Sequence, residues 1–128
     1  MTASYRIDLQ AGVVFIVLEG HVTNEMLFDH QKRMSADPDF RPTMNHVIDA
    51  RGVTEVAVTA LGIRLLASHS NLSPRSRRAI IEGEATPSLA YVRMFQTLRS
   101  QSGGDTRIFS KVEDALRWLG LDSPGVDS

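Results

Sequence analysis

Apolar positions along this chain repeat with the period of a strand in some segments and of a helix in others. Residues 5–9 alternate and residues 13–18 form a β-branched run, so a hairpin is expected to open the chain. Later apolar runs predict strands at 44–50, 77–82 and 106–109. Stripes at helical spacing predict helices at 24–35, 60–72, 87–102 and 111–119. The order ββαβαβαβα predicts an α/β fold with a mixed, mostly parallel five-stranded sheet and four helices.

The stretch from His46 to Leu61 lies at the centre of this order. It is expected to form the end of a buried strand, a tight turn at Gly52 with left-handed backbone, and a helix that Thr59 caps. In open α/β sheets, ligands and partners meet the protein beyond the carboxyl ends of such strands. A partner or ligand is therefore expected at the loop after the central strand. The candidate binding residues in this loop are Asp49, Arg51, Thr54, Glu55 and Thr59.

For several candidate side chains, a role in holding the structure is favoured over a role in catalysis or binding. Asp49 is expected to accept hydrogen bonds from backbone N–H groups of the turn rather than to act as a base. His46 is expected on the opposite face of the strand, which makes it a poor catalytic partner for Asp49. Leu61 and Leu65 are expected on the buried face of the second helix, and Arg78 at a solvated strand edge.

Composition narrows the classes of function. Of the 128 residues, 1–121 are expected to form a single domain and 122–128 a disordered tail. The formal net charge of -1 disfavours nucleic acid as a partner, and the lack of cysteine excludes disulfides, thiolate metal sites and thiol nucleophiles. No hydrophobic signal segment opens the chain, and no apolar run approaches the ~20 residues that span a bilayer. A cytoplasmic protein without membrane insertion is the expectation.

The sequence carries no pattern typical of an enzyme or of a cofactor site. Its histidines, which are His21, His30, His46 and His69, lack the spacing of metal ligands, and no phosphate-binding loop or nucleophile elbow occurs. His30 and His69 lie on apolar stripes, where histidine more often packs than ligates. We therefore expect no catalytic residue, no cofactor and no metal.

The element order and two segments, 47–54 and 106–119, resemble the SpoIIAA-like proteins, small bacterial relatives of the STAS domains that act as anti-sigma-factor antagonists. The segment 36–42, before the central strand, also resembles a sequence pattern that occurs in this group. The resemblance covers residues 4–120. It implies the SpoIIAA-like (STAS) fold and a role in regulation.

Antagonists of this family bind a protein-kinase-type anti-sigma factor, and phosphorylation of a serine at the start of the helix after the central strand switches them. The resemblance aligns Asp49, Gly52 and Thr54 with the family pattern and puts Val58 at the phosphorylated serine. Valine cannot accept a phosphoryl group. The neighbouring Thr59 is the candidate phospho-acceptor, although helix capping is the favoured role of its hydroxyl.

Two functions follow from these observations. The first is a non-enzymatic regulatory protein-interaction module that binds a protein partner without the phosphoserine switch. The alternative is a small-molecule or lipid carrier, because the SpoIIAA-like fold resembles that of the lipid-binding CRAL-TRIO (Sec14-like) domains. The edge hairpin and the first helix are also compatible with a homodimer.

Overall fold

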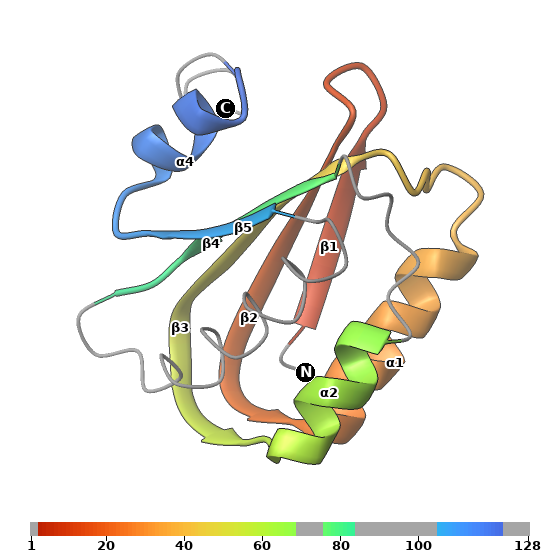
Figure 1. Cartoon of the computed structure of the whole chain (residues 1–128), viewed down its shortest axis with the longest axis vertical. Helices are drawn as coiled ribbons and strands as arrows, with labels where there is room; N and C mark the ends of the chain where they lie inside the picture. The colour runs from red at the N-terminus through yellow and green to blue at the C-terminus, as the bar shows by residue number, and fades with distance from the viewer. Residues whose placement is uncertain (1–2, 69–75, 84–104, 122–128) are drawn as a thin grey trace.

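The computed structural model describes residues 3–68, 76–83 and 105–121 of the chain. Among these residues, a five-stranded sheet lies between helices α1 and α2 on one side and helix α4 on the other (Figure 1). The elements are β1 (Ala3–Asp8), β2 (Val13–Thr23), α1 (Asn24–Ala36), β3 (Asn45–Ala57), α2 (Ala60–Ser68), β4 (Arg77–Ile81), β5 (Asp105–Phe109) and α4 (Val112–Trp118). The predicted helix at 87–102 and the predicted tail at 122–128 lie outside the described residues.

The strands follow one another across the sheet in the order β1-β2-β3-β4-β5. β1 and β2 form the predicted antiparallel hairpin, whose turn closes with a 2.9 Å hydrogen bond from the Gly12 N–H to the Asp8 carbonyl. Gly12 has a φ of 68°, which glycine adopts without strain. All later pairings are parallel, and α1 and α2 lie in the crossovers that connect β2, β3 and β4. The predicted mixed sheet, with the 44–50 strand in the middle, is confirmed.

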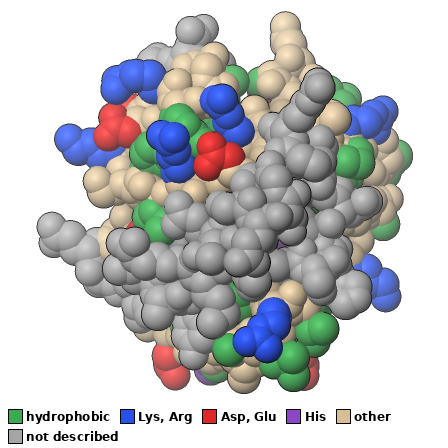
Figure 2. Space-filling model, viewed as in Figure 1, with side chains coloured by type: hydrophobic (Ala, Val, Ile, Leu, Met, Phe, Trp, Pro, Cys, Tyr) green, Lys and Arg blue, Asp and Glu red, His purple; other side chains and the backbone are tan. Residues whose placement is uncertain are grey.

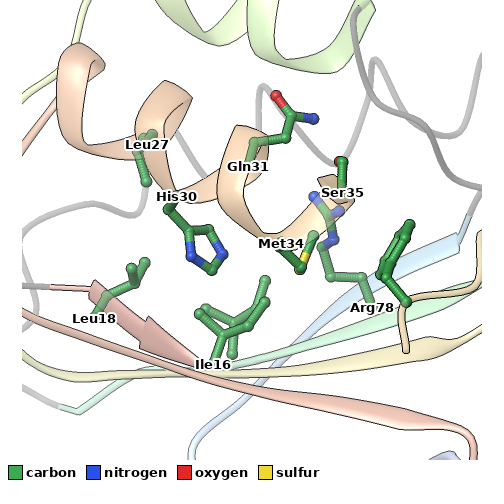
Figure 3. Close-up of a pocket in the computed structure, with 10 residues that line it drawn as sticks. Ile16, Leu18, Leu27, His30, Gln31, Met34, Ser35 and Arg78 are labelled. Atoms are coloured by element: carbon green, nitrogen blue, oxygen red, sulfur yellow. The ribbon is translucent and has the colours of Figure 1, made fainter. Parts of the chain in front are cut away.

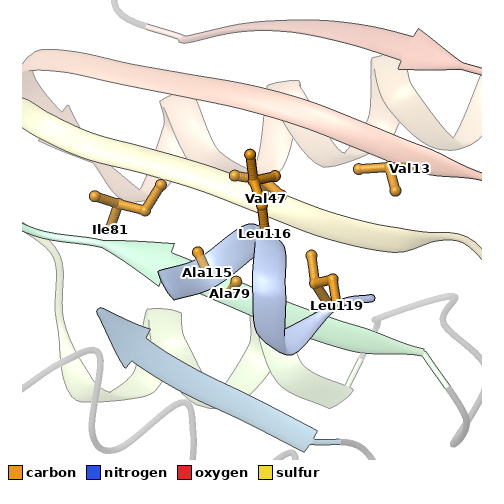
Figure 4. Close-up of a cluster of buried hydrophobic side chains, with 7 residues drawn as sticks. All are labelled: Val13, Val47, Ala79, Ile81, Ala115, Leu116 and Leu119. Carbon is orange, nitrogen blue, oxygen red and sulfur yellow. The ribbon is translucent and has the colours of Figure 1, made fainter. Parts of the chain in front are cut away.

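One hydrophobic core lies between the sheet and α4 (Figure 4). Its buried residues are Val13, Val47, Ala79, Ile81, Ala115, Leu116 and Leu119. The spacing of Ser110 and Glu113 predicts a capping box at the start of this helix, but α4 begins after Lys111, whose side chain makes no capping hydrogen bond, so this prediction is wrong. Burial of Ala115 and Leu116, which are 0% and 4% exposed, stabilises the helix in its place.

The opposite face of the sheet packs against α1 and α2. Successive side chains of a strand point to opposite faces, so Val14 and Ile16 lie on this side. Helical spacing predicts an inward stripe of Met26, Leu27, His30 and Met34 on α1, and of these His30 and Met34 are buried over the sheet. Threonine is a residue type that favours the N-cap, which predicts Thr23 as the cap of this helix, and the structure confirms it: Thr23 Oγ1 accepts the N–H of Met26 at 3.2 Å.

β2 and β3 run further than the sequence predicted. β2 has 11 residues and β3 has 13, and their pairing continues until Thr23 lies opposite Ala57. Two shifts of register, the first between Val17 and Glu19, take up the extra residues of β3, as bulges do. The predicted end of the central strand at Ala50 is therefore wrong, because β2 continues beside β3 and its backbone pairs with the added residues.

Gly52 lies inside β3 and forms no left-handed turn. It faces Glu19 across the strand pair, and a Cβ at this position would lie 3.2 Å from Cγ of Glu19. Glycine therefore permits a close cross-strand contact here. The candidate residues Asp49, Arg51 and Thr54 consequently belong to a strand and not to a loop, and so does Glu55.

Candidate functional site

The structure divides the predicted site residues into two groups. Asp49 and Arg51 line a cavity on the α4 side of β3. Thr54 and Glu55 are exposed further along the strand, and Thr59 stands immediately before α2. Direct hydrogen bonds join Asp49 to Arg51, whereas Thr59 bonds to residues of the two neighbouring helices.

Asp49 and Arg51 form a bidentate ion pair. Arg51 Nη2 lies 2.7 Å from Asp49 Oδ2, and Arg51 Nε lies 2.9 Å from Oδ1. Oδ1 also accepts the backbone N–H of Arg51 at 3.1 Å, next to the first register shift. The side-chain hydrogen bond from Arg51 holds the pKa of Asp49 below its ordinary value, against the opposing effect of partial burial. Asp49 is thus an ionised structural acceptor, as the sequence favoured, but its donor belongs to a bulged strand rather than to a turn.

Thr59 joins the beginnings of α1 and α2. Its Oγ1 accepts the N–H of Gly62 at 3.0 Å, which is the predicted capping bond. Oγ1 also accepts the side-chain amide of Asn24 at 3.1 Å, and Asn24 Oδ1 accepts the Thr59 N–H at 3.3 Å. A Cβ at Gly62 would collide with the Asn24 amide, so this close approach depends on glycine. Nothing in the sequence singles out Asn24, because its partner lies 35 residues away.

α2 presents an apolar stripe to solvent. Leu61 is 63% exposed and Leu65 is 41% exposed, and their i, i+4 spacing puts them on one helical face. The prediction that both are buried is wrong, because Ile63, at 6% exposed, faces the core together with Val58. Figure 2 shows hydrophobic side chains beside a basic one at the end of the molecule where Figure 1 places α2. We term the following exposed residues the distal surface: Thr54, Glu55, Thr59, Leu61 and Leu65.

A second candidate site, termed the His30 pocket, lies between α1 and the sheet (Figure 3). It is a cavity of about 70 Å³ whose walls are mainly apolar, with Ile16 and Met34 among them. His30 is 7% exposed, and its Nδ1 has no hydrogen-bond partner in the described part of the chain. Burial, followed by the charges of Arg33 and Arg78, lowers the pKa of His30 to about 4. The ring is therefore neutral at pH 7.

Arg78 is a half-buried wall of the His30 pocket and not part of a solvated strand edge, so its predicted role is wrong. It lies in β4 opposite His46 of β3, on the face of the sheet that α1 covers. Arg77, the preceding residue, points to the other face, where its guanidinium lies 5.4 Å from the Trp118 ring. Strand alternation thus separates two neighbouring arginines into different environments.

A larger cavity, of about 290 Å³, lies on the α4 side beside Val112. The Arg6 guanidinium stands 4.4 Å from the centroid of the Phe15 ring, in a cation–π contact. The Asp49–Arg51 pair forms another part of the wall. Both arginines are already engaged, one by an aromatic ring and the other by a carboxylate.

Among the described residues, the side chains offer no metal site and the helices no membrane span. No group of three or more His, Cys, Asp or Glu side chains among them could hold a metal ion. None of the described helices has the length and apolar character that crossing a bilayer requires.

His46 is fully buried, with its ring centroid 6.2 Å from that of Phe40, on the face of β3 opposite Asp49. The prediction that His46 and Asp49 point apart is therefore confirmed.

The architecture is similar to that of a solved protein. The crystal structure of an uncharacterized protein from the DUF3478 family of Shewanella loihica PV-4, with a SpoIIAA-like fold, matches this chain with a TM-score of 0.57. The match covers 92% of this chain and 94% of that chain, at 17% sequence identity. This chain has a SpoIIAA-like fold. At that identity the likeness shows the fold alone. No protein-family model matches the sequence, and no curated protein is significantly similar to it.

The SpoIIAA-like fold gives Val58 a particular interest, since the resemblance puts it at the phosphorylated serine of the antagonists. Val58 is 4% exposed and belongs to a core cluster with Ile63 and Ile80. Val58 thus packs in the core and has no hydroxyl group. The next residue, Thr59, uses its hydroxyl oxygen as a cap, and its role as a phospho-acceptor stays a prediction.

Proposed function

We propose that this protein is a non-enzymatic regulatory module that binds a protein partner through the distal surface. The observation that supports this most is the exposed Leu61–Leu65 pair at the start of α2. Apolar side chains grouped on one exposed helical face, with polar residues around them, are typical of a surface that a partner covers. The SpoIIAA-like fold supports the proposal at the level of architecture.

The expected partner offers an apolar groove with a polar rim. Leu61 and Leu65 form the centre of the contact, and fully burying each contributes roughly 1.5–3 kcal/mol. Glu55 and Arg64 are exposed nearby in the sequence and supply charges of both signs for the rim. Binding does not depend on a phosphoserine, because Val58 is a core residue.

Affinity capture with variants of this chain tests the proposal. Tagged wild-type protein and the double variant Leu61→Ser, Leu65→Ser are used as bait in cells that make the protein. The matched control is Leu9→Ser, which changes an apolar residue that is 57% exposed outside the distal surface. Circular dichroism shows whether each variant is folded.

A partner that wild type and Leu9→Ser retain, and that the double variant loses, supports the proposal. In titrations with the purified partner, the double variant is expected to bind at least about tenfold more weakly. Equal binding by all three proteins contradicts it. A dimer that only the double variant dissociates, seen by light scattering, identifies a second copy of this chain as the partner.

The carrier function remains the alternative. The described feature that favours it is the His30 pocket, since a buried polar group in an apolar cavity is the usual composition of a small-molecule site.

A further inference from the structure

β1 forms one edge of the sheet (Figure 1). Within the described part of the chain its only neighbouring strand is β2, so the backbone N–H and C=O groups on its outer side pair with no strand there. Proline, lysine and bulges often protect such an edge against pairing with another chain. β1 has no proline or lysine, and its register with β2 is unbroken over its six residues. The edge is therefore open to a further strand.

Two opposite charges lie side by side on one face of β1. Arg6 and Asp8 are two residues apart, so their side chains point to the same face of the sheet. The Arg6 guanidinium lies 4.4 Å from the centroid of the Phe15 ring, and Asp8 Oδ1 accepts the N–H of Ala11 at 3.0 Å. Neither side chain belongs to an ion pair among the described residues. Both charges are thus available to a partner at the edge.

The charges select the register in which β1 pairs with a second copy of itself. A two-fold axis across the sheet makes the two strands antiparallel, and it must pass through a residue position so that side chains on the same face meet. An axis at Ile7 puts Arg6 of each copy opposite Asp8 of the other. An axis at Arg6 or at Asp8 puts like charges opposite each other, which is destabilising. An axis at Tyr5 puts Arg6 opposite the uncharged Ser4.

We propose that two copies of this protein pair antiparallel through β1, with the two-fold axis at Ile7, so that their sheets become one continuous sheet. Phe15 lies opposite Arg6 on β2, and Asp8 of the other copy lies on the far side of the same arginine. The outer backbone groups of both edge strands then have partners. β1 shares no residue with the distal surface, so the outcome of this test is independent of the proposed function.

Sedimentation equilibrium of the full chain, at concentrations up to about 1 mM, tests the dimer. Wild type should show a molar mass that rises to that of a dimer. Arg6→Glu and Asp8→Lys each put like charges opposite one another at two symmetric places, and each should weaken the dimer at least about tenfold. The matched control is Arg107→Glu on β5, which also removes an exposed arginine from an aromatic ring and should dimerise as wild type does.

Combining the two substitutions tests the register. An equimolar mixture of the Arg6→Glu and Asp8→Lys proteins should form a heterodimer, because the introduced glutamate then faces the introduced lysine, and the remaining Asp8 faces the remaining Arg6. The chain that carries both substitutions should dimerise with itself for the same reason. Recovery of the dimer in the mixture also shows that the separate variants are folded.

A measurement on wild type alone covers the case in which a single variant does not fold. In a mixture of isotope-labelled and unlabelled chains, NOEs between the two copies should connect residue 6 of one copy with residue 8 of the other. The absence of such NOEs in a dimer overturns the proposed register.

Three further results overturn the proposal. They are a wild type that is monomeric at every concentration, a dimer that Arg6→Glu and Asp8→Lys leave intact, and folded single variants that stay monomeric when mixed. The double variant Leu61→Ser, Leu65→Ser should still dimerise. A dimer that only this double variant loses would assign self-association to the distal surface and not to β1.

Discussion

The two halves of the β2–β3 pair have different roles. Up to Val17 and Asp49 the register is unbroken, and alternate side chains fill a core on each face of the sheet. Beyond this point the register shifts twice, and the pair curves to the end of the molecule where α1 and α2 begin (Figure 1). Thr54 and Glu55 are exposed in this second half. Regular pairing thus provides the stability, and the departures from it shape the exposed surface.

The largest effect on the free energy of unfolding is expected in the regular half of the β2–β3 pair, where substitutions of two neighbouring residues should differ strongly. Ile16 is 4% exposed and Val17 is 38% exposed, because they point to opposite faces of β2. Ile16→Ala should lower the free energy of unfolding by about 3 kcal/mol through lost burial and a cavity. Val17→Ala should change it by less than about 0.5 kcal/mol. Urea denaturation measures both, and similar losses would contradict the assigned burial.

His30, which α1 places over the same half, should make stability depend on pH. Its pKa is about 4 in the folded protein against 6.5 for an ordinary histidine. The unfolded chain therefore takes up a proton as the pH falls below 6.5, while the folded chain does so only near 4. Stability should decrease across this interval by about 3 kcal/mol and level off below it.

Urea denaturation between pH 7 and pH 3.5 measures that decrease. In His30→Leu the part of the slope that is due to His30 should disappear, whereas His21→Leu should keep it. A slope that is the same in wild type and His30→Leu would contradict the buried, neutral histidine.

At the end of the second half, the hydrogen bonds of the Thr59 side chain should have an intermediate effect on the free energy of unfolding. Thr59→Ala removes the cap of α2 and the hydrogen bond that Thr59 Oγ1 accepts from the Asn24 side chain, whereas the backbone N–H of residue 59 still donates to Asn24 Oδ1. The expected loss is about 1–2 kcal/mol, since one cap contributes about 1 kcal/mol. Thr59→Ser keeps the oxygen and should recover most of it. Thr54→Ala, at an exposed position of β3, should be close to neutral, and thermal unfolding compares the three variants.

The Asp49–Arg51 ion pair, at the boundary between the halves, should have the smallest effect on the free energy of unfolding. Asp49→Asn should cost about 0.5–1 kcal/mol at pH 7, because the two side chains are 27% and 50% exposed and solvent screens the pair. The folded pKa of Asp49 lies below the ordinary value of 3.8, so its contribution is present above pH 3.8 and is lost as the pH falls through the folded pKa.

Denaturation at pH 7 and at pH 2 should therefore show a smaller difference in stability between the variant and wild type at the lower pH. Asp114→Asn is the matched control, because its pair with Arg117 is more exposed and should contribute less. An undiminished difference at pH 2 would show that the carboxylate charge is not the cause.

Local patterns in the sequence were enough to predict much of the fold. The opening hairpin follows from alternation and a turn glycine, and the caps at Thr23 and Thr59 follow from side chains that bond within three residues. The buried stripe of α1, with His30 and Met34, follows from helical spacing. In each case the atoms that interact are close in the chain, so the sequence itself determines the contact.

Only the tertiary structure decided the features that carry the proposals. β3 continues past Asp49 because β2 lies beside it and pairs with it. Leu61 is exposed because Ile63, on another face of α2, is the residue that packs in the core. The meeting of His30 with Arg78 in one pocket likewise depends on the position of α1 over β4. A strand's length depends on its neighbour, and an apolar helix can bury more than one face. The length of a strand and the buried face of a helix therefore depend on contacts between distant parts of the chain, which a local sequence pattern does not specify.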